Sequence, residues 1–92
     1  MNIEEYADAL NLELEIRRYP NQCNRYAASF ENCETKASAD DGCLTGTYGN
    51  GDSPSGAVVD YVQQIRGKIL VHQAYSGDKR REYVVPKNLK AF

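Results

Sequence analysis

One stretch that carries both a helix start and a helix stop places the strongest constraint on the fold of this chain. The Ser53 hydroxyl can accept a hydrogen bond from a first-turn amide, and Pro54 suits the first helical position because no N–H is needed there. Gly67 can adopt the left-handed conformation that ends a helix. Apolar residues recur between these marks at helical spacing, namely Ala57, Val58, Tyr61, Val62 and Ile65. This pattern predicts a helix over residues 54–66 with one apolar face, which needs a sheet to cover.

Alternation of apolar and polar residues predicts the strands of that sheet. Residues 12–17 and 25–30 both alternate, and the turn-forming residues 20–24 lie between them, so we expect an antiparallel hairpin. Further strands are expected at 33–36, 68–74 and 81–86, and residues 43–48 have strand character ahead of a glycine-rich turn. Ile3, Tyr6, Ala7 and Leu10 predict a short N-terminal helix.

These elements predict one small α+β domain over residues 1–92, in the order α-β-β-β-α-β-β, with an antiparallel sheet packed by one main helix. A chain of this length buries roughly 60–65 % of its unfolded surface, which suits one helix on one sheet. The sheet face expected under the helix includes Leu14, Ile16, Ala28, Phe30, Leu70 and Val84.

The glycine-rich segment superficially resembles a nucleotide-binding loop. Gly46, Gly49 and Gly51 lack the Gly-Lys-Ser/Thr ending of a phosphate loop and the ribose-binding acid of a dinucleotide fold. We therefore expect these glycines to supply positive-φ turn geometry. No Ser/His/Asp or Cys/His spacing indicates a nucleophile, so the sequence predicts neither an enzyme nor a cofactor.

The three cysteines, Cys23, Cys33 and Cys43, are odd in number and lack C-x-x-C spacing, which favours free thiols. The cysteines are ten residues apart, which is not the spacing of a zinc-binding motif. A zinc site built from them with His72, or any other metal site, is therefore not expected. Acidic residues at the N-terminus and the absence of an apolar run of roughly 20 residues argue against a secretory signal and a membrane span. We expect an intracellular chain.

Charge is distributed unevenly along a chain whose net charge is −2. Residues 61–92 contain seven bases against two acids, and a second basic group surrounds the first turn. The candidate binding residues are Arg17, Arg18, Tyr19, Asn21, Asn24, Arg25, Lys79, Arg80 and Arg81, with Tyr26, Tyr75 and Tyr83 nearby. Such groups suit phosphates and exposed bases, acidic protein surfaces, or simply solvated turns that keep sheet edges soluble.

Residues 47–71, preceded by Glu15-Ile-Arg-Arg-Tyr-Pro20 and followed by Arg80-Arg-Glu-Tyr-Val-Val-Pro86, resemble a group of small phage and prophage proteins. Within that group the chain is most similar to phage-encoded type I-F anti-CRISPR proteins, over about residues 12 to 86. The resemblance implies an inhibitor without catalytic residues.

It also implies the partners: Cas proteins of the host type I-F crRNA-guided surveillance complex and the crRNA itself, met in the host cytoplasm, with no small-molecule substrate. Inhibition would block either hybridisation of target DNA or recruitment of the nuclease. The alternative is a small phage nucleic-acid-binding or antitoxin-like module. For the inhibitor we expect that reversing Arg80 and Arg81, or Arg17 and Arg18, to glutamate weakens inhibition without unfolding the domain. Charged turn positions normally tolerate substitution, and the fold rests on the helix and the sheet.

Overall fold

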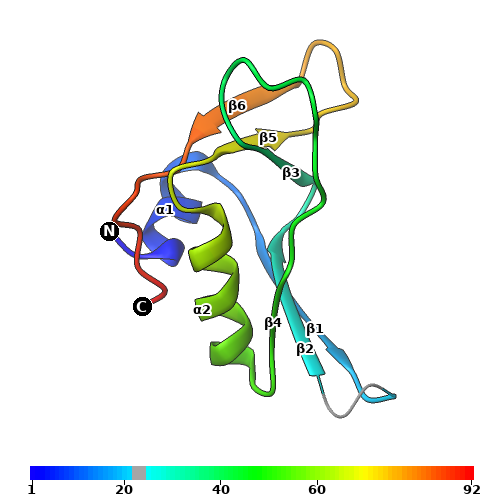
Figure 1. The fold of residues 1–92 in the computed structure, drawn as a ribbon, viewed down its shortest axis with the longest axis vertical. Coiled ribbons are helices and arrows are strands. Elements are labelled where there is room, and N and C mark those ends of the chain that lie inside the picture. Colours follow the sequence, from blue (N-terminus) through cyan, green and yellow to red (C-terminus); the bar gives the residue numbers. More distant parts are fainter. Residues whose placement is uncertain (22–24) are drawn as a thin grey trace.

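The computed structural model describes residues 1–21 and 25–92, which form two helices and two antiparallel sheets (Figure 1). The helices are α1 (Ile3–Leu10) and α2 (Pro54–Ile65). One sheet has the order β1-β2-β4 and comprises Leu14–Tyr19, Arg25–Phe30 and Gly49–Gly51. The other has the order β3-β5-β6 and comprises Cys33–Lys36, Ile69–His72 and Arg81–Val84. The α+β class is confirmed, but two sheets replace the single sheet that was predicted.

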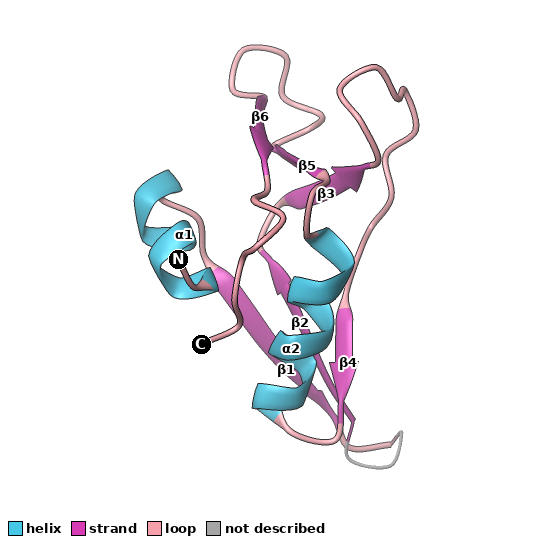
Figure 2. Cartoon of the chain, turned by 60° about the vertical axis from the view of Figure 1, so that its left-hand side comes forward, coloured by secondary structure: helices cyan, strands magenta, loops and turns pink. Residues whose placement is uncertain are grey.

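Helix α2 begins and ends where its sequence signals predict. Ser53 Oγ accepts a 3.0 Å hydrogen bond from the Gly56 amide, and Pro54 is the first helical residue. Gly67 has a φ of 71°, just beyond the cap residue Arg66. The five predicted apolar residues of the helix are all buried. Figure 2 shows α2 lying along the β1-β2-β4 sheet, and it packs mainly on β2 and β4.

Helix α1 is held at its start by a reciprocal cap. Asn2 Oδ1 accepts a 2.9 Å hydrogen bond from the Glu5 amide, and the Asn2 amide donates to Glu5 Oε1 at 3.0 Å. The C-terminal segment closes this side of the molecule, since the Ile3 amide donates to the Lys90 carbonyl at 2.8 Å. Both chain ends therefore lie beside each other (Figure 1), and Leu89 is fully buried near them.

The predicted hairpin and the third strand are present, but the chain leaves the first sheet between them. Asn32, directly before β3, has a φ of 57°. Asparagine tolerates this left-handed conformation better than most residues, and the resulting bend directs β3 into the second sheet. There the Asn32 carbonyl accepts a 2.9 Å hydrogen bond from the Gln73 amide, just after β5.

The prediction for the glycine-rich segment was wrong. Residues 43–48 form only an isolated bridge, between Thr45 and Thr35, whereas Gly49–Gly51 is the strand β4. Neither Gly49 nor Gly51 has a positive φ. A Cβ on Gly49 would overlap the α2 backbone at Ala57 and Tyr61, and one on Gly51 would lie 2.6 Å from the Ala57 amide nitrogen. These glycines allow a strand to lie directly against a helix.

The predicted inward face of the sheet is partly correct. Ala28, Phe30 and Leu70 are buried, and Leu14 packs against the core. Ile16 is 43 % exposed because α2 hardly reaches the edge strand β1. Val84 is 71 % exposed, and its neighbour Val85 is buried instead. The predicted strand phase was one residue out, and a shift of one residue exchanges the two faces of a strand.

Candidate functional site

The basic residues of the first hairpin do not form one patch. Arg17, Arg18 and Tyr19 are consecutive on β1, so their side chains alternate between the two sheet faces. Tyr19 pairs with Arg25 across the hairpin, near its tip. Asn21 is exposed in the turn, and Asn24 lies outside the described residues. Arg17 and Arg18 therefore cannot bind the same flat surface.

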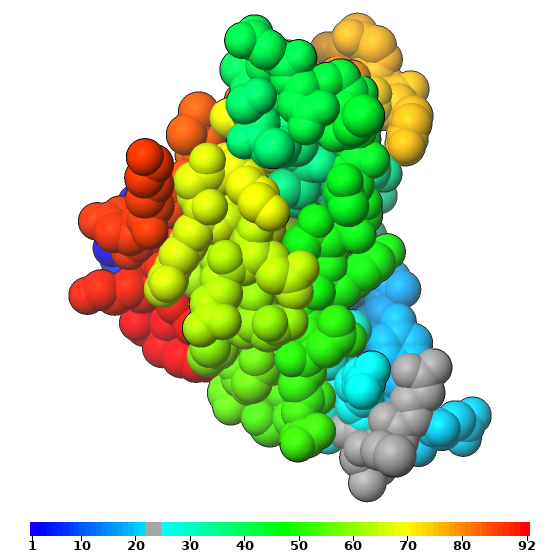
Figure 3. All heavy atoms as spheres, in the orientation of Figure 1, coloured from blue at the N-terminus to red at the C-terminus, as the bar shows by residue number. Residues whose placement is uncertain are grey.

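The second basic group lies at the opposite end of the molecule's long axis from the first hairpin (Figure 1 and Figure 3). Lys79 and Arg80 belong to the turn between β5 and β6, and Arg81 is the first residue of β6. Arg81 Nη1 donates hydrogen bonds to the carbonyls of Asp78 at 3.2 Å and Arg80 at 2.9 Å. These contacts with carbonyl oxygens help to shape the turn.

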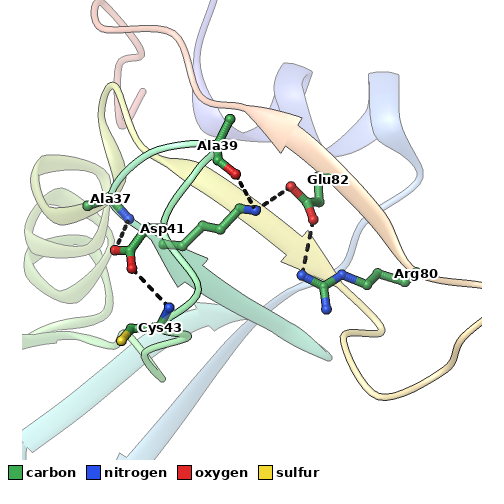
Figure 4. A network of polar contacts seen from close by, with 7 residues as sticks. Ala37, Ala39, Asp41, Cys43, Arg80 and Glu82 are labelled. Carbon is green, nitrogen blue, oxygen red and sulfur yellow. Dashed lines mark hydrogen bonds and ion pairs between the residues drawn. The ribbon is translucent and has the colours of Figure 1, made fainter.

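Arg80 belongs to a structural network of charges (Figure 4). Glu82 accepts from Arg80 at 3.0 Å and forms a 2.7 Å ion pair with Lys36, whose side chain is only 6 % exposed. Lys36 Nζ also donates to the Ala39 carbonyl at 3.1 Å. The hydrogen bond from Lys36, followed by that from Arg80, lowers the pKa of the Glu82 carboxyl. The prediction that the fold tolerates charge reversal at Arg80 does not fit this geometry. A glutamate at position 80 would face the carboxylate of Glu82.

One residue from each basic group lines a common groove of about 590 Å³, although the groups lie mostly apart. Arg17 contributes from the outer face of β1, and Lys79 from the β5–β6 turn. The walls between them come from residues 29–34, 46–48 and 73–76. Arg17 Nε donates to Glu15 Oε1 at 2.7 Å, and this hydrogen bond raises the pKa of the guanidinium.

Two exposed tyrosines and three carboxylates complete the groove. Tyr48 is 56 % and Tyr75 is 85 % exposed, so their rings are available to a partner. The acids of the groove are Glu15, Glu31 and Glu34. A side-chain hydrogen bond with Glu13, together with the charge of that carboxyl, raises the pKa of Glu31. The groove therefore combines cations, aromatic rings and anions, which suits a partner of mixed chemistry.

Tyr75 was predicted to lie near the binding residues. Tyr48 was not, because residues 43–48 were predicted to be a strand. Tyr26 and Tyr83 were expected to assist binding, yet both are half-buried and pack against the core. The signal that could have identified Tyr48 is its position between Gly46 and Gly49, in a segment where the structure has no strand.

Neither of the two cysteines that the structure describes supplies a nucleophile to this groove. Cys33 lines it, but burial raises the pKa of its thiol to about 12. Cys43 is exposed, and both thiols are free. Cys23 lies outside the described residues. Among residues 1–21 and 25–92, no group of three His, Cys, Asp or Glu side chains is placed to hold a metal ion.

Comparison of the chain with protein-family models, curated proteins and solved structures yields no match. Neither helix in the described part of the chain has the length and apolar character needed to cross a membrane.

Proposed function

We propose that this protein is an anti-CRISPR inhibitor that binds the crRNA-guided type I-F surveillance complex in the host cytoplasm. It acts by occupying a surface and has no catalytic role or cofactor. The resemblance of residues 47–71 and their flanking segments to type I-F anti-CRISPR proteins motivates this proposal. The groove that contains Arg17, Lys79, Tyr48 and Tyr75 is the observation that carries it.

The chemistry of the groove suits a ribonucleoprotein. Arg17 and Lys79 can contact guide RNA phosphates, and the exposed rings of Tyr48 and Tyr75 can stack on unpaired bases. The carboxylates of Glu15 and Glu34 repel free nucleic acid but attract the lysines and arginines of a DNA channel. Guide complexes present both features together, since they hold the guide along a positively charged channel. An inhibitor bound there blocks hybridisation of target DNA.

A small phage nucleic-acid-binding or antitoxin-like module is the second candidate, favoured by the pairing of cations with exposed tyrosines. Such a module binds naked RNA or DNA with an affinity that falls steeply as salt rises. The three carboxylates in the groove favour the inhibitor instead.

A pull-down with purified surveillance complex distinguishes the two candidates. The inhibitor is expected to be retained by the complex assembled on its guide, and to bind free crRNA at least about a hundredfold more weakly at physiological salt. The same experiment with complex lacking guide RNA reports how much of the contact belongs to the Cas proteins. Equal affinity for naked RNA and for the complex would support the nucleic-acid-binding module.

The step that is blocked is measured separately. If the protein prevents target DNA from binding, it acts on hybridisation. If DNA still binds and only its degradation stops, the inhibitor acts at nuclease recruitment. The location of cations and rings in one groove favours the first outcome.

A further inference from the structure

Strand β1 is a six-residue edge strand. It pairs with β2 on one side, and in the described part of the chain no strand lies along its other side. Edge strands of this length present unpaired N–H and C=O groups that can pair with another strand. Figure 2 shows β1 as the strand of its sheet that lies farthest from β4.

The backbone groups that face this open edge can be assigned. The Glu31 amide donates to the Glu13 carbonyl at 2.8 Å, in the same register that pairs Leu14 with Phe30. Hydrogen-bonded and non-hydrogen-bonded pairs alternate along an antiparallel ladder. Odd-numbered β1 residues therefore bond to β2, and the backbone groups of Leu14 and Ile16 point to the open edge.

On the helix-facing side of the sheet, Leu14 and Ile16 place apolar side chains beside that edge, and Arg18 follows on the same face toward the hairpin turn. Ile16 is 43 % exposed, and with Leu14 it borders a small groove of about 250 Å³. Val58 of α2 and Phe92, which is 69 % exposed, also line this groove. A strand added beside β1 would cover this apolar surface, which is an incentive for association.

We propose that β1 pairs with β1 of a second copy of this chain, antiparallel and about a two-fold axis through Ile16. Charge selects this register. Glu15 then lies opposite Arg17 of the second copy, and Arg17 lies opposite Glu15, while Ile16 meets its own copy on the apolar side. Shifting the register so that the axis passes through Glu15 or Arg17 brings like charges into contact. Both shifts are therefore disfavoured, because directly opposite like charges destabilise a strand pair.

The geometry of the two ion pairs reinforces this choice. Positions 15 and 17 form the non-hydrogen-bonded pairs of the new ladder, in which side chains approach most closely. The carboxylate and guanidinium already meet within one chain at 2.7 Å, and their side chains are 38 % and 62 % exposed. They can exchange partners across the axis, and the β1-β2-β4 sheets of the two copies then form one six-stranded sheet with two-fold symmetry.

Sedimentation analysis of wild type, Glu15→Arg and Arg17→Glu chains tests this proposal at concentrations up to about 0.5 mM, which detects micromolar dissociation constants. The wild type should dimerise reversibly. Each single variant should dimerise about tenfold more weakly or worse, because both symmetry-related pairs become repulsive. A 1:1 mixture of the two variants should recover dimers, since one chain presents two cations and the other two anions.

Recovery in the mixture is diagnostic, because the ion pair within each chain stays broken in both variants. Asp78→Arg and Lys68→Glu introduce the same charge changes at exposed positions away from β1 and should leave dimerisation unchanged. A wild type that stays monomeric throughout the range would overturn the proposal. So would a mixture that associates no better than its components, or control variants that weaken the dimer as much as those on β1.

Discussion

The phenolic oxygen of Tyr61 on α2 accepts a 3.1 Å hydrogen bond from the backbone N–H of Phe30 on β2. This amide points away from β1, toward the side where β4 runs. However, β4 pairs with β2 only as far as Gly49, opposite Ala28. The Tyr61 hydroxyl therefore supplies the acceptor that the sheet lacks at this position, and it joins the helix to the strand inside the core.

Replacing Tyr61 with phenylalanine should destabilise the fold by about 1–3 kcal/mol, because the buried Phe30 amide loses its acceptor. Urea denaturation measures the change in the free energy of unfolding. Tyr75→Phe removes a hydroxyl from a ring that is 85 % exposed and should leave the transition unchanged. Equal midpoints for the two variants would show that this hydrogen bond contributes nothing to stability.

Gly49→Ala should destabilise the protein by about 3 kcal/mol, since the added methyl group overlaps the α2 backbone and separates β4 from the helix. Gly42→Ala is the matched control, because no atom beyond the neighbouring residues of the chain lies within 4 Å of a Cβ at that position. Thermal unfolding of both variants provides the comparison. A Gly49→Ala protein that melts with the wild type would refute the close-packing account of β4.

The network around Glu82 predicts a loss of stability in acid. The pKa of Glu82 is lower in the folded protein than its ordinary value of 4.5. Its contribution is therefore fully present above the ordinary pKa, and it is lost as pH falls through the folded-state pKa. The wild type should exceed Glu82→Gln in stability near pH 7, and the difference should shrink below about pH 4.

Urea denaturation across this pH range measures that difference. Asp78→Asn, which removes an exposed carboxylate from the adjoining turn, serves as the control variant. A difference between wild type and Glu82→Gln that stays constant from pH 7 to pH 3 would contradict the role assigned to Lys36 and Arg80.

The two described cysteines should differ in reactivity. Burial raises the pKa of Cys33 to about 12, so only on the order of 1 in 10,000 Cys33 thiols is ionised at pH 8. Cys43 is exposed and should be alkylated by iodoacetamide much faster. Peptide mass spectrometry over a time course identifies each site, and protein unfolded in urea supplies the reference rates. Equal labelling of both thiols in the folded protein is the outcome that this account excludes.

Local signals in the sequence predicted the features that depend on local physics. Ser53, Pro54 and Gly67 specified the bounds of α2 because caps act within one helical turn. The alternation around Ala28 and Phe30 predicted the hairpin, because the two-residue period of a strand is also a local pattern. Strand β3 was placed correctly, but its sheet was not, since a bend at one residue, Asn32, assigns it to a different layer.

Features that depend on distant packing could not be predicted in this way. The sequence shows where a glycine stands, but it does not show whether the position needs a positive φ or close contact with another backbone. Gly49 is required for close contact with the backbone of α2. The sequence did not indicate which residues of β6 face the core. Its partner strand gives no guide, because Ile69, Leu70 and Val71 are all buried and do not alternate. The groove joins Arg17 to Lys79 across 62 positions of sequence, so no spacing rule could identify it.

The most direct test of the proposed inhibition is target-DNA binding by guide-loaded type I-F surveillance complex, measured against increasing amounts of this protein. A variant carrying Lys79→Glu and Tyr75→Ala alters the groove without touching β1 or the Glu82 network, and Lys68→Glu is the control for charge. Wild type and control should abolish DNA binding, and the groove variant should need at least tenfold more protein, since a lost charge contact in an interface costs about 2–5 kcal/mol. If the folded groove variant inhibits as well as the wild type, or the wild type leaves DNA binding intact, the groove is not the surface that blocks hybridisation.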